Sequence, residues 1–312
     1  MTATPMTQTD LLRELTPIVE RELNRHEKAA KEWFPHDYVP WSDGRNYDGL
    51  MGGEPWSPDD ADVTEAARSA LIVNLLTEDN LPSYHFEIAT AFGRDSAWGE
   101  WVGRWTAEEG RHGTAIRDYV TVKRLVDPVE LERLRMQHMG QGYRSPQDGD
   151  MLRTVAYVSF QELATRISHR NTGVYTRDQM CEQLLQRIAA DENLHMIFYR
   201  NLLAAALEVA PDQTVSAIRD VVVGFQMPGA DIPGFQRKAV EIAVAGIYDL
   251  RSHRDEVLVP VLRYLKLWEL EGLAGAGEAS RTELGTFMEE LERQATRFED
   301  KRETLKSRMG IA

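Results

Sequence analysis

The sequence EGRH at residues 109–112 is matched further along the chain by ENLH at 192–195, so that a glutamate stands three residues before a histidine in both. A single glutamate precedes each motif at a similar interval, because Glu78 lies 31 residues before the first motif and Glu162 lies 30 before the second. Residues three apart on a helix point from the same face. Two such helices, and two helices with one glutamate each, can surround one interior site. The spacing predicts a ligand set for two metal ions.

The candidate ligands lie on helical faces that are otherwise apolar. A single Glu-x-x-His motif is also typical of a solvated helix face, but a solvated glutamate has polar neighbours at helical spacing. Of the eight histidines, only His112 and His195 have a glutamate three residues earlier. One of four such apolar stripes comprises Trp98, Val102, Trp105, Glu109, His112, Ile116 and Tyr119.

Charge and donor chemistry indicate which metals fit. Four glutamates supply four negative charges, which match two divalent ions, whereas ionised glutamates in an apolar core without metal are costly. Without metal, some of them should be protonated. Carboxylate oxygens together with imidazole nitrogens suit iron or manganese. The predicted ligands are Glu78, Glu109, His112, Glu162, Glu192 and His195.

Length and composition limit the class of protein. The 312 residues contain no Pro/Gly/Ser-rich linker, so we expect one domain over residues 1–312. The single cysteine, Cys181, fits a reducing cytoplasm. Residues 1–10 lack a basic segment followed by an apolar run, and no stretch approaches the roughly twenty apolar residues of a membrane span. The net charge of -14 argues against nucleic-acid binding. We expect a soluble cytoplasmic protein without a membrane span.

Helical periodicity covers almost the whole chain, which predicts an all-α protein. Pro82 lies four residues after Glu78 and predicts either a kink beside a ligand or a local turn. Several helices are expected after residue 213. The core helices are expected at 65–93, 96–125, 148–172 and 176–208, with a short helix at 128–140 as the crossover between two helical hairpins.

Six stretches resemble one known family over nearly the whole chain. The stretches are EWFPHDY at 32–38, TEDNLPSY at 77–84, WTAEEGRHG at 105–113, SFQE at 159–162, ISHRNT at 167–172 and ADENLH at 190–195. The family is that of the soluble acyl-carrier-protein desaturases, which includes the plant stearoyl desaturase and actinobacterial-type relatives. Two departures, Gly110 in place of asparagine and Asn193-Leu194 in place of a basic pair, leave the preferred partner open.

The resemblance implies a ferritin-like di-iron helical bundle with additional C-terminal helices. It assigns the six ligands to two iron ions, for which manganese is a substitute, with Glu109 and Glu162 or their equivalents as bridges. Thr165 matches a threonine beside the oxygen-binding side of the cluster. Asp191 and Trp33 match an aspartate and a tryptophan that link His112 to the surface for electron entry. A core tryptophan and a surface aspartate are the alternative interpretations.

The implied activity is oxygen-dependent desaturation of a saturated fatty-acyl chain on acyl carrier protein, which introduces a cis double bond. No protein side chain removes hydrogen from an unactivated chain, so the oxidising power must come from O2 and two reduced irons. The implied partners are acyl carrier protein, a ferredoxin-type electron donor and a second copy of the chain. Candidate residues that line an acyl channel are Ile88, Thr90, Thr154 and Val155, for each of which core packing is the alternative.

Three other functions share parts of this pattern. A di-metal fatty-acyl hydroxylase or oxidase would use the same ligands. A non-catalytic ferritin-like metal-binding protein would need the ligands but not the desaturase motifs or the helices after residue 213. A ribonucleotide-reductase radical subunit would need a tyrosine beside the cluster, for which Tyr199 and Tyr157 are candidates.

Overall fold

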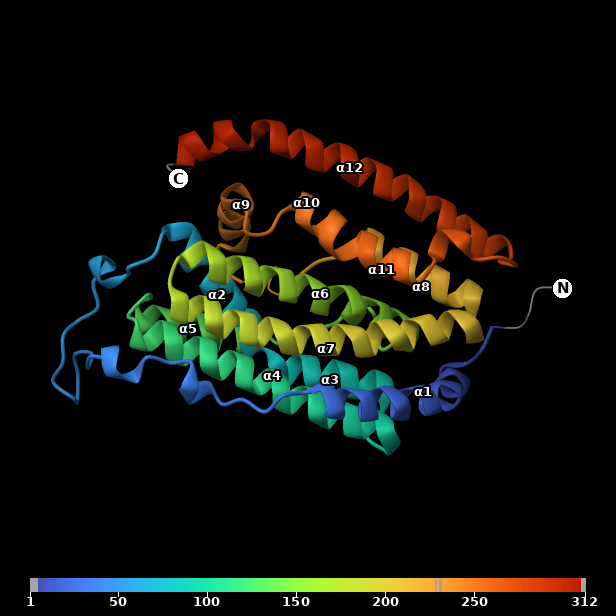
Figure 1. Ribbon diagram of the computed structural model, residues 1–312, viewed down its shortest axis with the longest axis horizontal. Coiled ribbons are helices and arrows are strands. Elements are labelled where there is room, and N and C mark those ends of the chain that lie inside the picture. Colours follow the sequence, from blue (N-terminus) through green and yellow to red (C-terminus); the bar gives the residue numbers. More distant parts are fainter. Residues whose placement is uncertain (1–4, 228, 230–231, 310–312) are drawn as a thin grey trace.

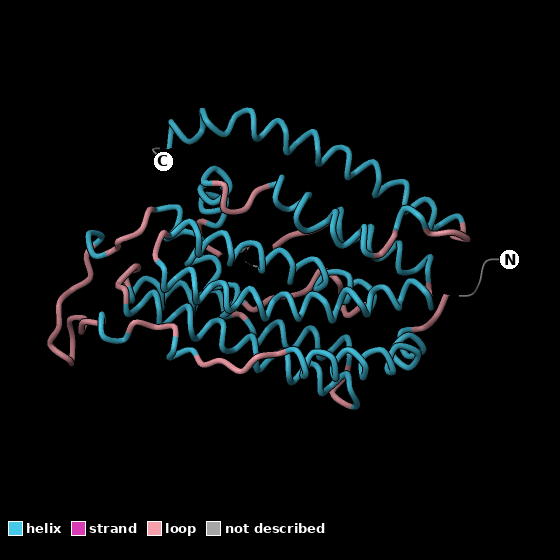
Figure 2. The backbone as a smooth tube through the Cα atoms, viewed as in Figure 1, coloured by secondary structure: helices cyan, strands magenta, loops and turns pink. Residues whose placement is uncertain are grey.

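The computed structural model describes residues 5–227, 229 and 232–309, and its regular structure is helical (Figure 1). Figure 2 shows helices joined by loops, and the described residues contain no strand beyond one isolated bridge between Tyr47 and Glu54. The helices in chain order are α1 (Gln8–Ala29), α2 (Glu65–Asp79), α3 (Leu81–Phe92), α4 (Ser96–Val122), α5 (Pro128–Gln141), α6 (Met151–Thr176), α7 (Gln179–Val209), α8 (Pro211–Val223), α9 (Phe235–Ala245), α10 (Leu250–Ser252), α11 (Val259–Tyr264) and α12 (Gly275–Met309).

Helices α6 and α7 run side by side through the middle of the molecule (Figure 1). Helix α4 packs against both α2 and α7, and α1 packs against α4 and α7 from outside this group. On the other side, α8 packs against α6 and α7, and the long α12 covers α8 along the outer edge (Figure 1). The predicted all-α bundle with additional C-terminal helices is confirmed. Among the described residues, no helix has both the length and the apolar character that crossing a bilayer requires.

Aspartates set the beginnings of three helices. The side chain of Asp127 accepts hydrogen bonds from the first backbone amides of α5, Asp150 does so for α6, and Asp178 does so for α7. Such capping satisfies amides that have no partner within the helix and stabilises each helix by about 1 kcal/mol. These caps explain why α6 and α7 begin within three residues of their predicted starts at 148 and 176.

The expected helix at 65–93 is two helices, α2 and α3, separated at Asn80. The carbonyl of Asn80 accepts from the amides of Ser83 and Tyr84, which begins α3. Pro82 occupies the first turn of α3, where a missing amide hydrogen costs nothing. The local turn is therefore the better of the two interpretations of Pro82. Helix α1 was not predicted from the sequence.

Gly173 allows α6 to approach α7 closely. A Cβ atom at this position would lie 3.0 Å from the Cα of Glu182 and 3.3 Å from the Cβ of Leu185, both on α7. Because the nearest atom belongs to the backbone, it cannot move away as a flexible side chain would. Gly103, in the exposed face of α4, has no such neighbour within 4 Å.

We expect Gly173→Ala to lower the free energy of unfolding by about 1–3 kcal/mol, since the added methyl group forces α6 and α7 apart. The matched control, Gly103→Ala, should raise it by up to about 1 kcal/mol because alanine favours a helix. Urea denaturation followed by circular dichroism measures both. A Gly173→Ala variant as stable as the wild type would contradict the close packing.

Candidate metal centre

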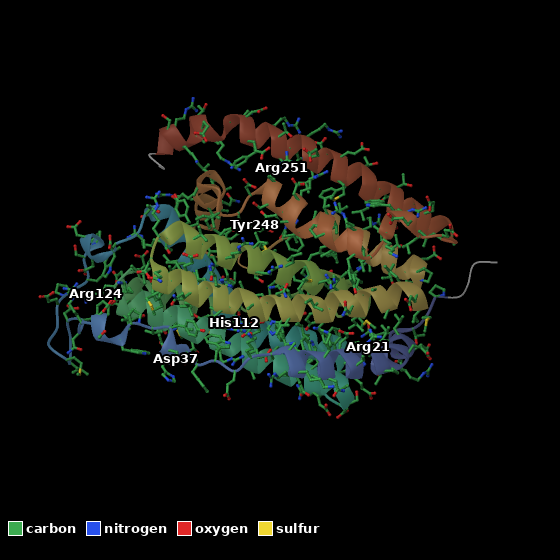
Figure 3. The ribbon with its side chains drawn as sticks, in the orientation of Figure 1. Arg21, Asp37, His112, Arg124, Tyr248 and Arg251 are labelled. Atoms are coloured by element: carbon green, nitrogen blue, oxygen red, sulfur yellow. The ribbon has the colours of Figure 1, made fainter. Side chains whose placement is uncertain are left out.

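The six predicted ligands meet inside the bundle, where His112 is visible between α4 and α7 (Figure 3). None of the six is more than 7% exposed. Four helices of the bundle supply them. They are Glu78 from the last turn of α2, Glu109 and His112 from α4, Glu162 from α6, and Glu192 and His195 from α7.

The ligands form two groups of four that share two glutamates. One group contains Glu78 and His112, the other contains Glu162 and His195, and Glu109 and Glu192 belong to both. In each group, one donor atom per residue lies within 4.8 Å of the others. The first residues of the two Glu-x-x-His motifs occupy the shared positions, whereas the resemblance named Glu109 and Glu162 or their equivalents as bridges.

Hydrogen bonds hold the two unshared carboxylates at the outside of the site. His169 Nε2 lies 2.8 Å from Glu78 Oε1, and Trp105 Nε1 donates to Glu162 Oε1 at 3.0 Å. Each bond occupies one oxygen and leaves the second oxygen directed inward. This arrangement is the physical reason why Glu162 belongs to one group only.

The inward atoms of the ligands lie close together without hydrogen-bonding partners. His112 Nδ1 is 3.2 Å from Glu192 Oε1, and His195 Nδ1 is 2.8 Å from Glu109 Oε1. Among the described residues, five inward atoms that are buried make no hydrogen bond. They are Glu109 Oε1, His112 Nδ1, Glu162 Oε2, Glu192 Oε1 and His195 Nδ1.

Buried polar atoms without partners are rare in proteins and call for a specific explanation. Two metal ions would provide one, because each group offers three carboxylates and one imidazole, the donor set that suits iron or manganese. The residues present therefore fit a dinuclear metal site.

Burial and mutual repulsion determine the proton affinities of these groups. Burial, together with the charges of Glu192 and Glu109, raises the pKa of Glu162 well above its usual value. Burial alone would lower the pKa of His112 and of His195, but the neighbouring carboxylates raise both pKa values well above normal. The site therefore holds protons without metal, and metal binding must displace them.

Asp191 and Trp33 form a chain of contacts that begins at His112. Trp33 Nε1 donates to Asp191 Oδ2 at 2.7 Å, and His112 Nε2 lies 3.5 Å from the same oxygen. The rings of Trp33 and His112 are nearly parallel, with centroids 6.3 Å apart. Burial opposes ionisation of Asp191, but its bonds with His112 and Trp33 lower its pKa to about 2. Asp191 is a buried residue, 2% exposed, and not a surface aspartate.

Thr165 lies one turn after Glu162 and contacts both α6 and α7. Its Oγ1 is 2.9 Å from Glu192 Oε2 and 3.0 Å from the carbonyl oxygen of Glu162. Thr165 also lines the cavity described next. It therefore stands between a shared ligand and the space that reaches the site.

A cavity with about 700 Å³ of empty space, part of it open to solvent, reaches the ligands from one side. It lies among α2, α3, α4, α6 and the loop after α5. Its lining includes the ligands Glu78 and Glu109, and also Trp105 and Thr165, which hydrogen-bond to the ligands Glu162 and Glu192.

Two of the four predicted channel residues line this cavity, namely Ile88 and Thr154. Thr90 does not, because its side chain is exposed on α3 and its hydroxyl donates to the carbonyl of Phe86. Val155 is fully buried in the apolar core and is not a lining residue. Residues one or two apart on a helix point in different directions, so one member of each neighbouring pair faces away from the cavity.

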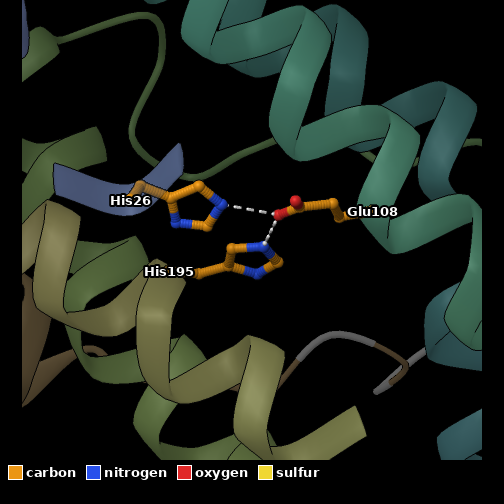
Figure 4. A group of neighbouring side chains, drawn as sticks. All are labelled: His26, Glu108 and His195. Atoms are coloured by element: carbon orange, nitrogen blue, oxygen red, sulfur yellow. Dashed lines mark hydrogen bonds and ion pairs between the residues drawn. The ribbon is translucent and has the colours of Figure 1, made fainter. Parts of the chain in front are cut away.

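Three further residues of the site were not identified from the sequence. His169 bonds to Glu78, and Glu108 and His26 lie behind His195 (Figure 4). Burial opposes ionisation of Glu108, but hydrogen bonds from His195 and His26 hold its pKa far below the usual value. Two of the three could have been found from the sequence, because Glu108 adjoins Glu109 and His169 lies two helical turns after Glu162. Nothing in the sequence around His26 indicated its role.

The two candidate radical tyrosines both lie near the site. Tyr199 is fully buried one turn after His195, and its hydroxyl makes no hydrogen bond within the described part of the chain. Tyr157 lines the cavity and donates to the carbonyl of Gln226 at 3.0 Å. Their positions alone do not separate a radical subunit from a desaturase.

Similarity to known proteins identifies the family. A sequence model of the fatty acid desaturase family matches residues 7–311. DesA1 of Mycobacterium tuberculosis, which bears the name of an acyl-[acyl-carrier-protein] desaturase, is 51% identical over 301 residues, or 94% of this chain and 89% of DesA1. A chloroplastic stearoyl-[acyl-carrier-protein] 9-desaturase of Oryza sativa is 31% identical over 284 residues, or 84% of this chain and 71% of the plant protein.

The X-ray structure of DesA2 from Mycobacterium tuberculosis, whose title also names an acyl-ACP desaturase, is similar to this fold. It has a TM-score of 0.70 and 30% sequence identity, and the match covers 84% of this chain and 97% of that one. The similarity confirms the expected ferritin-like helical bundle. With the family match over nearly its whole length, this chain belongs to the fatty acid desaturase family.

Proposed function

We propose that this protein removes two hydrogens from a saturated fatty-acyl chain carried on acyl carrier protein and leaves a cis double bond, using O2 at a carboxylate-bridged di-iron centre. The observation that carries the proposal is the cavity that leads directly to Glu78 and Glu109, one an outer and one a shared carboxylate. The named activity of DesA1 and of the plant relative supports the same substrate class.

Two bound iron ions would supply the reaction with O2 that side chains cannot perform. The chain itself would bind and orient the substrate. Ile88, Leu81 and Val158 give the cavity an apolar wall that holds methylene groups and excludes water. Thr165 would hold Glu192 in place at the cavity side of the centre through its 2.9 Å contact.

Electrons would reach the centre through residues that do not line the cavity. Trp33, Asp191 and His112 form a continuous hydrogen-bonded and stacked path from the loop after α1 to a ligand. Trp33 is 5% exposed, and its neighbour Phe34 is 47% exposed, so a donor could approach within one residue of the indole. A ferredoxin-type donor, a homodimeric assembly and a cytoplasmic location complete the proposal and rest on the family resemblance alone.

The direct test is mass spectrometry of acyl products after aerobic incubation of iron-loaded protein with a panel of saturated acyl carrier proteins, ferredoxin, its reductase and NADPH. We expect one chain length to lose two hydrogens, because the cavity has a fixed depth. Gain of one oxygen would instead assign a hydroxylase. An unchanged panel, with iron content and reduction verified, would contradict the proposal.

Alanine variants test the metal centre independently of the substrate. Glu192→Ala removes a ligand of both groups, so we expect both ions to bind at least about 100-fold more weakly. Loss of a residue that only hydrogen-bonds to a ligand typically weakens binding about 10- to 100-fold, and loss of a ligand should cost more. His112→Ala should weaken the ion of one group. Iron per chain, measured colorimetrically after dialysis, and product formation should fall together.

The control is Glu208→Ala, an exposed glutamate on the same helix as Glu192. It should keep wild-type iron content and activity. Retention of iron and activity by both Glu192→Ala and His112→Ala would overturn the ligand assignment.

Substitutions in the cavity wall should change the preferred chain length. Thr154→Leu adds volume at a lining position, so we expect a shift toward shorter acyl chains, whereas Ile88→Ala should shift the preference toward longer ones. Thr90→Leu, on the exposed face of α3, is the control and should leave the preference unchanged. Product profiles from competing acyl carrier proteins measure the effect, and an unaltered profile for both lining variants would refute the cavity as the acyl site.

A further inference from the structure

The ring of His195 contacts a carboxylate of α4, and that carboxylate also contacts a histidine of α1 (Figure 4). Glu108 Oε2 lies 2.9 Å from His195 Nε2 and 2.9 Å from His26 Nε2. The other oxygen of Glu108 accepts from Arg104 Nε at 2.6 Å. His26, Glu108 and His195 are each 3% exposed or less. One buried carboxylate therefore receives hydrogen bonds from three residues.

This arrangement fixes which nitrogen of His195 carries the proton. A carboxylate surrounded by donors accepts only, so His195 must donate to it from Nε2. Nδ1 is then free to act as a ligand, and it is the atom that lies 2.8 Å from Glu109 Oε1 inside the second group. A hydrogen bond at one ring nitrogen is the usual way in which proteins orient a histidine whose other nitrogen binds a metal.

The same three residues are close enough together to hold a metal ion, but their partners favour hydrogen bonding. A single oxygen of Glu108 lies 2.9 Å from both histidine nitrogens, and its second oxygen accepts from the cationic Arg104. A guanidinium on the same carboxylate already supplies the positive charge that a cation would bring.

Aromatic packing holds His26 in position. Its ring lies edge-on to Trp101, with centroids 5.1 Å apart, and is nearly parallel to the ring of His195 at 5.7 Å. Trp101 in turn stacks on Phe198 of α7. His26 comes from α1, which lies outside the four helices that supply the ligands.

We propose that Glu108 and His26 are a positioning pair that orients His195 toward its metal ion, so that α1 is a functional part of the metal site. The inference rests on the proposed metal centre. Each ligand histidine then has its own non-ligand carboxylate beside its Nε2 atom, Asp191 for His112 and Glu108 for His195. Each carboxylate then receives a different second partner, Trp33 in the first case and His26 in the second.

The test is titration of the full-length metal-free protein with Co²⁺, followed by visible absorption and by calorimetry. We expect the wild type to bind two ions. Glu108→Gln and His26→Leu should each weaken one ion by about 10- to 100-fold and alter the absorption bands of that ion only. Asp191→Asn should instead weaken the other ion. A residue that only supports folding would not select one of two ions.

Two further variants separate positioning from the attachment of α1. His26→Gln keeps a donor and should recover part of the affinity that His26→Leu loses. Glu22→Gln is the matched control, because Glu22 is 3% exposed on α1 and accepts from Asn201 of α7 at 2.8 Å without touching a ligand. It should bind both ions as the wild type does.

Wild-type affinities and spectra in both Glu108→Gln and His26→Leu would overturn the inference. An equal loss in Glu22→Gln would also overturn it, because attachment of α1 would then explain the effect. If Glu108→Gln does not fold, as judged by circular dichroism, the comparison of His26→Leu with His26→Gln decides. Failure of the wild type to bind Co²⁺ would instead remove the metal centre itself, and this inference with it.

Discussion

Four carboxylates buried within one apolar bundle are the constraint on which the rest of this structure depends. An ionised carboxylate without partners is very costly in such surroundings, and even a paired one costs several kcal/mol of desolvation, an order-of-magnitude figure. In three of the four, one oxygen has a hydrogen-bond partner on α4 or α6. Their inward oxygens converge instead, which only cations or protons can compensate. The donors are His169 for Glu78, Trp105 for Glu162 and Thr165 for Glu192.

The two faces of the site have different surroundings. The cavity meets Glu78, Glu109 and Thr165 on one face. Asp191 and Glu108 contact the ring nitrogens of the two histidines that point away from the other ligands, and neither carboxylate lines the cavity. An acyl chain can therefore approach without displacing the hydrogen bonds that orient the histidines. Access to the site and orientation of the histidines therefore depend on different residues.

The sequence identified residues that the fold brings together because their spacing is encoded locally. Spacing within one helix determines that Glu109 and His112 share a face, and the apolar stripe determines that the face is buried. Which carboxylates are shared between the groups depends on contacts between helices. Glu192 replaces Glu162 in that role because Trp105, 57 residues from Glu162 in the chain, holds the latter to one side. No local pattern carries that information.

Helix boundaries and channel residues show the same limit. The break at Asn80 divides a stretch whose apolar periodicity is continuous, so periodicity alone favoured a single helix. Thr90 is a small residue two positions after Ile88, but two residues on a helix correspond to about 200° of rotation, and Thr90 is exposed to solvent. His26 lies 82 residues from Glu108, on a helix with no ligand of its own.

The contribution of α1 follows from the same electrostatic constraint. Once Glu108 is buried beside His195, one donor from His195 and one from the half-exposed Arg104 leave a lone pair of its Oε2 facing the protein interior. Within the four ligand-bearing helices, Trp101 and Phe198 stack in the neighbouring space, and Arg111 stays 4.0 Å from the other oxygen of Glu108. The donor to Oε2 comes instead from α1, which packs against α4 and α7. The position of His26 is thus a consequence of placing a second buried carboxylate behind a metal-binding histidine.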